Sequence, residues 1–472
     1  MGNQDCSLGL VGLGTMGRNL ALNIADHGFS VAVYNRTSEK TREFIDREAE
    51  DRDIRGSYTL AEFVGRLQRP RAIIIMVPAG PPVDAVIAEI TPLLAPGDLL
   101  IDGGNSYFRD TDRRGRVLAE KGLLYLGLGV SGGEEGARYG PSLMPGGPKE
   151  AYNRVEPILA AIAAKVRGEP CVAYLGNGAA GHYVKMVHNG IEYAVMELLA
   201  EAYDLLRRGL SLSPGEIAGI FEAWNRGEAA SFLVEITGPI LRRLDEKTGK
   251  PVIDLILDQA RQKGTGKWTS REAMDLQVPI PSIDAAVTLR DLSGFKAERE
   301  AAGRVLKGPS PVFQGDRQFL AEQLGRGLHA AMVLAFAQGL DLLRRASRAY
   351  DYRLDLAAVA GIWRGGCIIR AAFLEDIHRA YRAHPKLRHL LLGPHLGRGV
   401  IHRVPDLRVV VKAAVDLGIP APGLMASLAY YDAFRSARLP ANLIQAQRDY
   451  FGAHGYERLD APGAFHTDWK KR

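Results

Sequence analysis

The stretch Lys-Met-Val-His-Asn-Gly-Ile-Glu-Tyr places five polar side chains at helical spacing: Lys185, His188, Asn189, Glu192 and Tyr193. At about 100° per residue, they fall within about 140° of arc, on one face of a helix. An amine and a carboxyl group then lie two turns apart, ~10 Å along the axis, which leaves room for a small polar molecule between them. Apolar residues flank the stretch and predict a largely buried helix. The alternative is a half-exposed helix whose polar face meets water.

The amino-acid composition limits the classes of protein to which the chain can belong. The chain has 472 residues, enough for two or three domains, and its 46% hydrophobic content is ordinary for a globular protein. Three scattered cysteines fit a reducing cytoplasm and argue against disulfides and a zinc site, so no metal is expected. No apolar run approaches the ~18 residues that span a bilayer, and the N-terminus lacks signal-peptide features. The net charge of +6 is dispersed, which favours a phosphorylated metabolite over nucleic acid as ligand.

A glycine fingerprint follows the first apolar stretch. Residues 7–11 are predicted to form a strand that runs into Gly-Leu-Gly-Thr-Met-Gly, and a helical pattern continues to His27. In this setting the glycines permit a tight turn, approach of the backbone to a pyrophosphate, and close helix packing, with the helix N-terminus facing the phosphates. The alternative is a glycine loop without a nucleotide. The predicted cofactor contacts are Gly12, Leu13, Gly14, Thr15, Met16 and Gly17.

The end of the second predicted strand, residues 30–34, distinguishes two cofactors. It is followed by Asn35, Arg36 and Thr37, whereas NAD-specific domains usually place an acid here to hold the ribose hydroxyls. An acid would repel a 2′-phosphate, while Arg36 and the Thr37 hydroxyl would bind one. NADP is therefore the expected cofactor. The alternative is that Arg36 is merely a surface cation.

Three further predicted strands complete an α/β domain over residues 1–180. They span 72–77, 99–102 and 124–128, and their alternation with helical or loop segments is typical of a doubly wound parallel sheet. Ligands of such sheets gather at the carboxyl ends of the strands. The loops expected at those ends are 78–80, 103–106 and 131–136, and the last offers a hydroxyl and several backbone N–H groups for a carboxylate.

Beyond residue 180 the pattern becomes helical and repeats itself. Asp-Leu-Leu-Arg-Arg occurs at 204–208 and 341–345, Ile/Val-Ala-Gly-Ile-Phe/Trp at 217–221 and 359–363, and Phe-Leu at 232–233 and 373–374. Because the matches keep the same order, we expect an all-helical domain over residues 181–437 with a duplicated unit whose copies pack together. Chance similarity between amphipathic helices is the alternative.

Two more segments stand out in the second half. Lys-Gly-Thr-Gly-Lys-Trp-Thr, from Lys263, is not a P-loop, because Arg261 and Trp268 occupy required motif positions. A basic glycine loop can nevertheless hold a phosphate or adjoin a charged substrate. The tail, residues 438–472, is too short to bury a core alone. It is either disordered or docked, and its aromatic residues favour docking on a neighbouring subunit.

Together these segments resemble the 6-phosphogluconate dehydrogenase family, the decarboxylating, NADP-linked enzymes of the pentose phosphate pathway. The resemblance covers essentially the whole chain. Its most specific carrier is the run 130–147, Val-Ser-Gly-Gly-Glu-Glu-Gly-Ala-Arg-Tyr-Gly-Pro-Ser-Leu-Met-Pro-Gly-Gly. The other carriers are the segments 12–17, 35–37, 103–106, 185–193, 263–269 and 448–454.

The resemblance implies particular roles. Lys185 and Glu192 would be the catalytic pair. Cofactor contacts would extend to Val77, Pro78, Ala79 and Asn105. Substrate contacts would be Asn105, Ser131, Gly132, Gly133, His188, Asn189, Tyr193, Lys263, Arg290, Arg448 and His454, of which Tyr193, Lys263, Arg290 and Arg448 would hold the phosphate. In the family, the residues that correspond to Arg448 and His454 reach in from the partner subunit. This implies an obligate homodimer with exchanged tails.

Two departures from the family pattern fall near these residues. Many members read Val-Lys-Ala where this chain has Val77, Pro78 and Ala79. Proline removes a cation and a backbone donor there, which bears on cofactor affinity. Gly455 stands where the family usually has threonine, and it is expected to loosen the tail locally.

The implied reaction is oxidation of a secondary alcohol β to a carboxylate, followed by loss of CO₂ from the keto acid, without a metal. Lys185, deprotonated, would accept the hydroxyl proton and return it to the carbonyl as CO₂ leaves. Glu192, protonated, would deliver a proton to the enediol carbon. A general base needs a pKa near the working pH, so that of Lys185 must fall from its usual ~10.4. Burial and the cations Lys263 and Arg290 are expected to lower it.

Other functions fit parts of the pattern. Another β-hydroxyacid dehydrogenase, of the 3-hydroxyisobutyrate type, shares the N-terminal domain and an analogous lysine but lacks the duplicated helices and the tail. A catalytically silent NADPH-binding regulator is opposed by the intact pair Lys185 and Glu192. Nucleic-acid binding is opposed by the dispersed charge, and no membrane association is expected.

Overall fold

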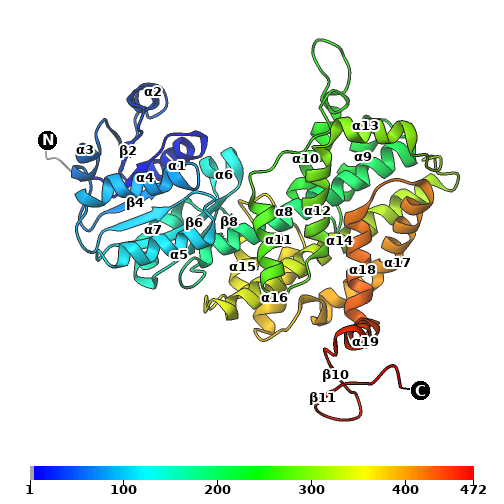
Figure 1. Cartoon of the computed structure of the whole chain (residues 1–472). Coiled ribbons are helices and arrows are strands. Elements are labelled where there is room, and N and C mark those ends of the chain that lie inside the picture. The colour runs from blue at the N-terminus through cyan, green and yellow to red at the C-terminus, as the bar shows by residue number, and fades with distance from the viewer. Residues whose placement is uncertain (1–4, 472) are drawn as a thin grey trace.

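The N-terminal part of the chain is built on a seven-stranded sheet. The computed structural model describes residues 5–471, and in it the strand order is β3-β2-β1-β4-β5-β6-β7 (Figure 1). The strand order reverses at β1 and β4, so a crevice for ligands opens at the carboxyl ends of these two strands. The strands are β1 (Leu8–Val11), β2 (Val31–Tyr34), β3 (Ile54–Ser57), β4 (Ala72–Ile75), β5 (Leu99–Asp102), β6 (Leu124–Ser131) and β7 (Ser142–Gly146).

Helices cover both faces of this sheet. Successive residues of the buried strands point to opposite faces, so that Ile73 and Ile75 enter one apolar layer and Ile74 enters the other. This two-sided burial explains why the central strands read as continuous apolar runs. The helices of this part are α1 (Thr15–Asp26), α2 (Ser38–Arg47), α3 (Leu60–Gly65), α4 (Pro81–Ile90), α5 (Phe108–Ala119), α6 (Gly133–Tyr139) and α7 (Lys149–Ile162).

The doubly wound sheet predicted from the sequence is confirmed, with two additions. The sequence analysis missed β3 and β7. All neighbouring strands are parallel except β6 and β7, which pair antiparallel. A parallel crossover needs a dozen or more residues, and the connection from Ser131 to Ser142 holds only the short helix α6. Part of the expected loop 131–136 is therefore helical, since α6 begins at Gly133.

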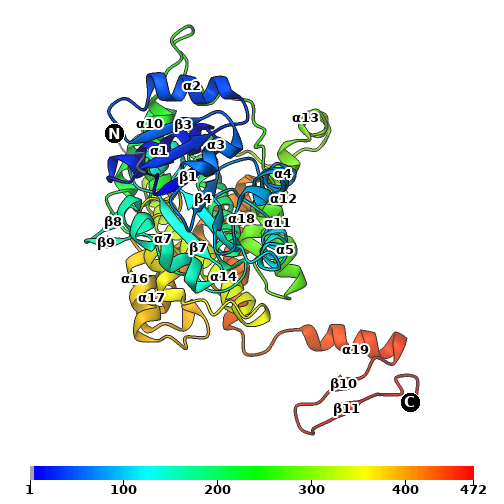
Figure 2. The ribbon, with the colours of Figure 1, turned by 90° about the vertical axis from the view of Figure 1, so that its left-hand side faces the viewer.

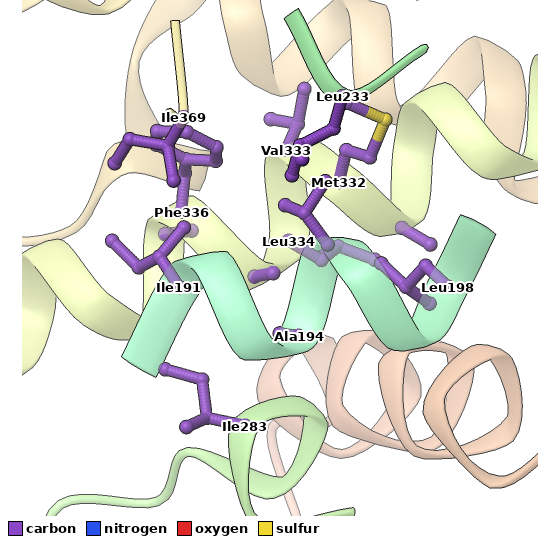
Figure 3. Packing of buried hydrophobic residues seen from close by; sticks show 14 of the residues in the cluster. Ile191, Ala194, Leu198, Leu233, Ile283, Met332, Val333, Leu334, Phe336 and Ile369 are labelled. Carbon is purple, nitrogen blue, oxygen red and sulfur yellow. The ribbon is translucent and has the colours of Figure 1, made fainter. Parts of the chain in front are cut away.

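The rest of the chain is helical and is organised around α8 and α14. In Figure 3, Ile191, Ala194 and Leu198 of α8 pack against α14 residues that include Met332 and Phe336. The helices are α8 (Ala180–Asp204), α9 (Pro214–Trp224), α10 (Phe232–Arg242), α11 (Thr265–Asp275), α12 (Pro281–Ser293), α13 (Lys296–Val305), α14 (Arg317–Ala349), α15 (Leu356–Ile362), α16 (Leu374–Ala383), α17 (Pro394–Leu417), α18 (Pro422–Arg435) and α19 (Ala441–Gly452). Small hairpins are β8 (Lys165–Val166) with β9 (Glu169–Pro170), and β10 (Tyr456–Glu457) with β11 (Ala464–Phe465).

The repeated sequence segments occupy matching places in two helical series. The first series is α8, α9 and α10, and the second is α14, α15 and α16. The connections before α10 and α16 pair antiparallel at Ser231 and Ala371. The Phe232 N–H donates to the carbonyl oxygen of Arg370, and the N–H of residue 372 donates to that of residue 230. Contact between equivalent points is what a two-fold relation between the copies produces.

The tail leaves the helical part and projects away from it, as Figures 1 and 2 show from two directions. Asp449 of α19 organises it. The carboxylate of Asp449 accepts hydrogen bonds from the Gly455 N–H, His466 Nδ1, the Thr467 N–H and Trp469 Nε1, at 2.8–3.0 Å. Burial opposes ionisation of this carboxyl, but these donors lower its pKa. The tail is thus a small folded unit.

Gly455 occupies a hydrogen-bonded turn of the tail, and the loosening expected there stays a prediction. Its N–H bonds to Asp449, and its carbonyl oxygen accepts from Gln445 Nε2 at 2.5 Å. Its φ of 71° lies in the left-handed region that favours glycine. The glycine therefore fits the turn that returns the chain toward α19. The division of the whole chain at residues 180 and 437 stays a prediction.

Candidate active site

A cleft of about 1040 Å³ lies where the carboxyl ends of the strands face α8, α11 and α12. It brings together most of the residues singled out from the sequence, although they come from both halves of the chain. The predicted residues that line it are Gly14, Thr15, Met16, Gly17, Val77, Pro78, Ala79, Asn105, Ser131, Gly132, Gly133, Lys185, Asn189, Glu192, Tyr193, Lys263 and Arg290.

The glycine fingerprint has the geometry of a dinucleotide turn. Gly12 has a φ of 104°, and a Cβ there would lie 2.4 Å from the carbonyl oxygen of Met76. A Cβ at Gly17 would lie 1.9 Å from the carbonyl oxygen of Gly12, so the helix can approach the strand only with glycine at this position. A Cβ at Gly14, by contrast, would meet nothing within 4 Å. No side chain caps α1, so its first N–H groups remain available to a pyrophosphate.

The segment after β2 fits a 2′-phosphate. Asn35 is used internally, since its Oδ1 accepts the Leu13 N–H at 3.0 Å and thereby fixes the fingerprint turn. Arg36 and Thr37 are exposed. Over residues 5–471, Arg36 makes no hydrogen bond or ion pair, and residues 35–37 themselves include no Asp or Glu. The residues present therefore fit NADP.

The position of Lys185 depends on close contact between α8 and the sheet. A Cβ at Gly129 of β6 would lie 2.6 Å from the Cβ of Lys185, and one at Gly181 would lie 2.4 Å from the carbonyl oxygen of Gly127. On the other side of α8, a Cβ at Gly190 would lie 2.7 Å from a methyl carbon of Thr269. Glycines on both sides thus bring the polar face of α8 against the strand ends.

The polar face of α8 forms one hydrogen-bond network. Lys185 Nζ donates to Asn189 Oδ1 at 2.9 Å and lies 3.4 Å from His188 Nδ1, which is itself 3.1 Å from Asn189 Oδ1. His188 Nε2 lies 3.2 Å from the hydroxyl of Ser131. Lys185, His188 and Ser131 are buried, whereas the side chain of Glu192 is 23% exposed. The half-exposed alternative for this helix is therefore wrong.

Burial shifts the titrating groups of this network toward their neutral forms. It lowers the pKa of Lys185, which Glu192 partly offsets, and raises the pKa of Glu192 against the opposing charges of Lys185 and Arg290. Burial and the Lys185 charge place the pKa of His188 well below its ordinary value. Neither Lys263 nor Arg290 is among the charges that shift Lys185, so that part of the expectation is wrong. Burial thus moves the pKa of Lys185 in the direction that suits a base and the pKa of Glu192 in the direction that suits an acid.

Cations line the cleft beyond Glu192. Arg290 lies flat over the ring of Tyr193, with 3.5 Å between the guanidinium carbon and the ring centroid. A Cβ at Gly266 would lie 2.5 Å from the same ring, so α11 can pack this closely against Tyr193 only with glycine at this position. Lys263 precedes α11 and lines the cleft with Arg261. A phosphate would find two to three positive charges here.

The sequence analysis missed several lining residues. The one farthest along the sequence from the other lining residues is Ile368, in the connection between α15 and α16. In that connection the Gly366 carbonyl oxygen accepts the Ser142 N–H at 2.7 Å, and the Trp363 ring packs edge-on against His188. The repeat match ending at Trp363 gave no signal that the following residues reach the sheet. Gly80, Gly103, Gly104, Thr265 and Trp268 lie in loops that were expected near the ligand, although no contact was assigned to them individually. The other missed residues are Met76, Tyr107, Asp110, Val130, Arg261 and Gln262.

Two predicted substrate residues lie outside the cleft of this chain. Arg448 is exposed on α19, where its Nη1 donates to Gln445 Oε1 at 3.2 Å. His454 is exposed beside the ring of Phe451. Both stand on the projecting tail (Figure 2). Gly12, Leu13, Asn35, Arg36, Thr37 and His188 also do not line the cleft. Of these, Gly12 lies against Met76 and His188 beside Ser131 and Asn189, which do line it.

Known proteins match the chain over nearly its whole length. Residues 7–176 match the NAD binding domain of 6-phosphogluconate dehydrogenase, and residues 181–469 match the C-terminal domain of that enzyme. A decarboxylating 6-phosphogluconate dehydrogenase of Synechococcus elongatus is 53% identical over 98% of both chains. An NADP(+)-dependent, decarboxylating one of Bacillus subtilis is 52% identical over 98% of this chain and 99% of its own.

A solved structure agrees with the sequence matches. It is a Plasmodium falciparum 6-phosphogluconate dehydrogenase, studied in its apo form and in complexes with its cofactor NADP+ and its substrate 6-phosphogluconate. It is 43% identical, covers 98% of this chain and 100% of its own, and superposes with a TM-score of 0.96. The matched domains, the identity and the shared architecture lead to one conclusion. The chain belongs to the 6-phosphogluconate dehydrogenase family.

Proposed function

We propose that the chain catalyses the NADP-dependent oxidative decarboxylation of 6-phospho-D-gluconate to D-ribulose 5-phosphate and CO₂, a step of the pentose phosphate pathway. The observation that carries the proposal is the pair formed by the buried Lys185 and the partly buried Glu192 on one face of α8. On one side of this face lies a glycine turn that fits a dinucleotide, and on the other lie Lys263 and Arg290, which fit a phosphate.

The first step is oxidation of the hydroxyl-bearing carbon β to the carboxylate. Lys185, held by Asn189 and lowered in pKa by burial, accepts the hydroxyl proton. NADP, held at the glycine turn of residues 12–17, would supply the acceptor for the hydride of the same carbon. Ser131, with its backbone neighbours at the start of α6, orients the carboxylate. His188, kept neutral, holds the Ser131 hydroxyl.

The second step breaks the bond between the carboxylate and the adjacent carbon. The ammonium of Lys185 gives its proton to the ketone oxygen as CO₂ leaves, and an enediol remains. Glu192, whose pKa burial raises, would act in its protonated form and deliver a proton to the enediol carbon that carried the carboxylate. Lys185 takes back the hydroxyl proton as the ketone forms. A final proton transfer from Lys185 to Glu192 restores both groups, so that protons and electrons balance over the cycle without a metal ion.

We further propose that the working unit is a cytosolic homodimer in which each tail completes the other subunit's site. Arg448 and His454 lie outside the cleft of their own chain, and α19 presents apolar side chains to solvent. Leu443 is 60%, Ile444 61% and Phe451 73% exposed. A neighbouring subunit that covered these residues would remove them from water and bring the two polar side chains to a cleft.

The test is turnover of 6-phosphogluconate with NADP and with NAD in parallel. The proposal predicts formation of reduced cofactor with NADP and a much lower kcat/KM with NAD. The matched inactive control is Lys185→Met, which keeps the volume of the side chain and removes the base. Absence of turnover with either cofactor contradicts the proposal.

A further inference from the structure

A single buried guanidinium joins two loops of the cleft. Arg114 of α5 has a side chain that is 2% exposed. On one side its Nη2 donates to the Gly80 carbonyl oxygen and to Asp84 Oδ2, both at 3.0 Å, and its Nε donates to Asp84 Oδ1 at 2.9 Å. On the other side its Nη1 donates to Asp102 Oδ2 at 3.2 Å and to Ser106 Oγ at 3.3 Å. Gly80 and Asp84 lie in the connection after β4 and in the first turn of α4, whereas Asp102 ends β5 and Ser106 lies in the connection after it.

Asp102, fully buried at the end of β5, completes this joint. Its Oδ1 accepts the Gly104 N–H at 3.1 Å, and its Oδ2 accepts the hydroxyls of Ser106 at 2.7 Å and Tyr125 at 2.9 Å. These bonds hold the turn on both sides of Asn105, which lines the cleft. The conformation that presents Asn105 therefore depends on the Asp102 carboxylate, and through it on Arg114.

The joint is charged at every ordinary pH. Hydrogen bonds from Arg114 lower the pKa of Asp84 to about 2, so that carboxylate stays ionised. Arginine itself keeps its charge at any pH compatible with folding. The geometry also requires arginine, because its planar fork directs separate N–H donors toward the two loops. A lysine ammonium carries its three donors on one nitrogen atom and cannot reproduce this fork.

Both loops line the cleft beside the glycine fingerprint. The first contributes Pro78 and Ala79, and the second contributes Gly103, Gly104 and Asn105. We propose that Arg114 is a positioning residue for hydride transfer, which sets the spacing between these two loops and hence between bound cofactor and substrate. This inference rests on the proposed function. A misplacement of about 1 Å between reacting groups lowers the rate by about 10²-fold.

The same domain contains a matched control. Arg71 and Asp98 form a second buried Arg–Asp pair, with 2.9 Å between Arg71 Nη1 and Asp98 Oδ2. They directly precede β4 and β5, the strands whose other ends carry the Arg114 joint. The Arg71 pair therefore lies at the amino edge of the sheet, away from the cleft. Substitution there perturbs the same strands without touching either loop.

The experiment compares Arg114→Lys with Arg71→Lys in the full-length enzyme. Three quantities are measured for each: the thermal unfolding midpoint, the Kd for NADPH by fluorescence titration, and the primary deuterium isotope effect on kcat with substrate deuterated at the oxidised carbon. Arg114→Lys is expected to lower kcat by about tenfold or more, to raise the isotope effect and to weaken NADPH binding several-fold. Arg71→Lys is expected to lower only the unfolding midpoint.

The outcomes separate the two proposals. If wild-type enzyme turns over and Arg114→Lys keeps the wild-type isotope effect and NADPH affinity, the positioning role is overturned, whatever happens to its stability. If wild-type enzyme does not oxidise 6-phosphogluconate, the proposed function fails, and NADPH affinity alone decides the role of Arg114. Weaker binding in Arg114→Lys than in Arg71→Lys then supports the joint, and equal binding overturns it.

Discussion

Lys185 and Glu192 stand two helical turns apart on α8, and burial shifts their pKa values in opposite directions, toward the neutral amine and the protonated carboxyl. Their mutual charge works against both shifts. Asn189 holds Lys185, and His188 bridges from this network to Ser131. The acid and base forms required by the proposed mechanism thus arise from desolvation by the packed helix, with hydrogen bonds supplying orientation.

This arrangement predicts a bell-shaped dependence of kcat/KM on pH. The rate falls on the acidic limb of the profile because Lys185 becomes protonated and cannot act as a base. Above the alkaline limb Glu192 ionises and cannot act as an acid. The two apparent pKa values of this profile belong to the coupled pair Lys185 and Glu192, and not to either residue alone. Glu192→Gln is expected to lower kcat by about 10²- to 10⁴-fold and to abolish the alkaline limb.

Glu197→Gln is the matched control for the pH profile. Glu197 lies on the same helix, and burial raises its pKa to about 6, but it does not line the cleft. Its substitution is expected to keep both limbs. An alkaline limb that persists unchanged in Glu192→Gln would refute the acid assignment.

Arg36 offers a second prediction at this scale. Arg36→Ala is expected to lower kcat/KM for NADP by about 10- to 100-fold, because one or two charge-assisted hydrogen bonds to the 2′-phosphate are lost. The turnover with NAD is expected to stay nearly unchanged. Lys40→Ala, a surface cation one turn into α2, controls for general loss of positive charge. Equal losses with NADP and NAD would show that Arg36 does not contact the 2′-phosphate.

Among the structural elements, the contact between β6 and α8 determines where the base stands. Gly129 lies on the strand directly against Lys185. We expect Gly129→Ala to overpack this contact and to lower the free energy of unfolding by about 1–3 kcal/mol. We also expect kcat to fall by a larger factor than the loss of folded enzyme alone would explain. Denaturant unfolding and turnover on the same samples measure both effects.

Gly219→Ala is the control for this substitution. A Cβ at Gly219 of α9 meets nothing within 4 Å. Alanine there is expected to stabilise the helix by up to ~1 kcal/mol, with no change in turnover. A Gly129→Ala enzyme with wild-type stability and rate would mean that α8 can shift away from β6 without consequence.

Much at the level of elements could be predicted from the sequence, because the central strands and the glycine turn depend on local patterns. The strand β3, Ile-Arg-Gly-Ser, carries too few apolar residues for such a pattern. The antiparallel direction of β7 depends on the length of its connection, which periodicity does not show. Ile368 reaches the cleft only through contacts between segments far apart in the sequence, such as Gly366 with Ser142, and no local signal encodes such contacts.

At the scale of the whole molecule, the cleft of one chain lacks Arg448 and His454, which stand on a tail that projects away from it (Figure 1). The tail folds around Asp449 and shows apolar side chains to solvent. Over residues 5–471, no helix is both long and apolar enough to cross a membrane. A second copy of the chain is the partner that would use both the apolar surface and the two polar side chains.

Subunit complementation tests this exchange of tails. Lys185→Met and Arg448→Ala are each expected to be nearly inactive alone. Coexpressed, they form mixed dimers in which the intact cleft of one subunit receives the intact tail of the other. Random pairing then restores roughly a quarter of the wild-type activity. If Arg448 acted within its own chain, every site in the mixture would be defective, and activity would stay at the level of the single variants.

The most direct measurement for the whole account is the stoichiometry of the reaction. Wild-type enzyme is given NADP and 6-phosphogluconate labelled in its carboxylate carbon, and NADPH and labelled CO₂ are followed together. The account predicts that they form in equal amounts, and that Lys185→Met forms neither. NADPH without CO₂, or no NADPH at all from the wild-type chain, would contradict it.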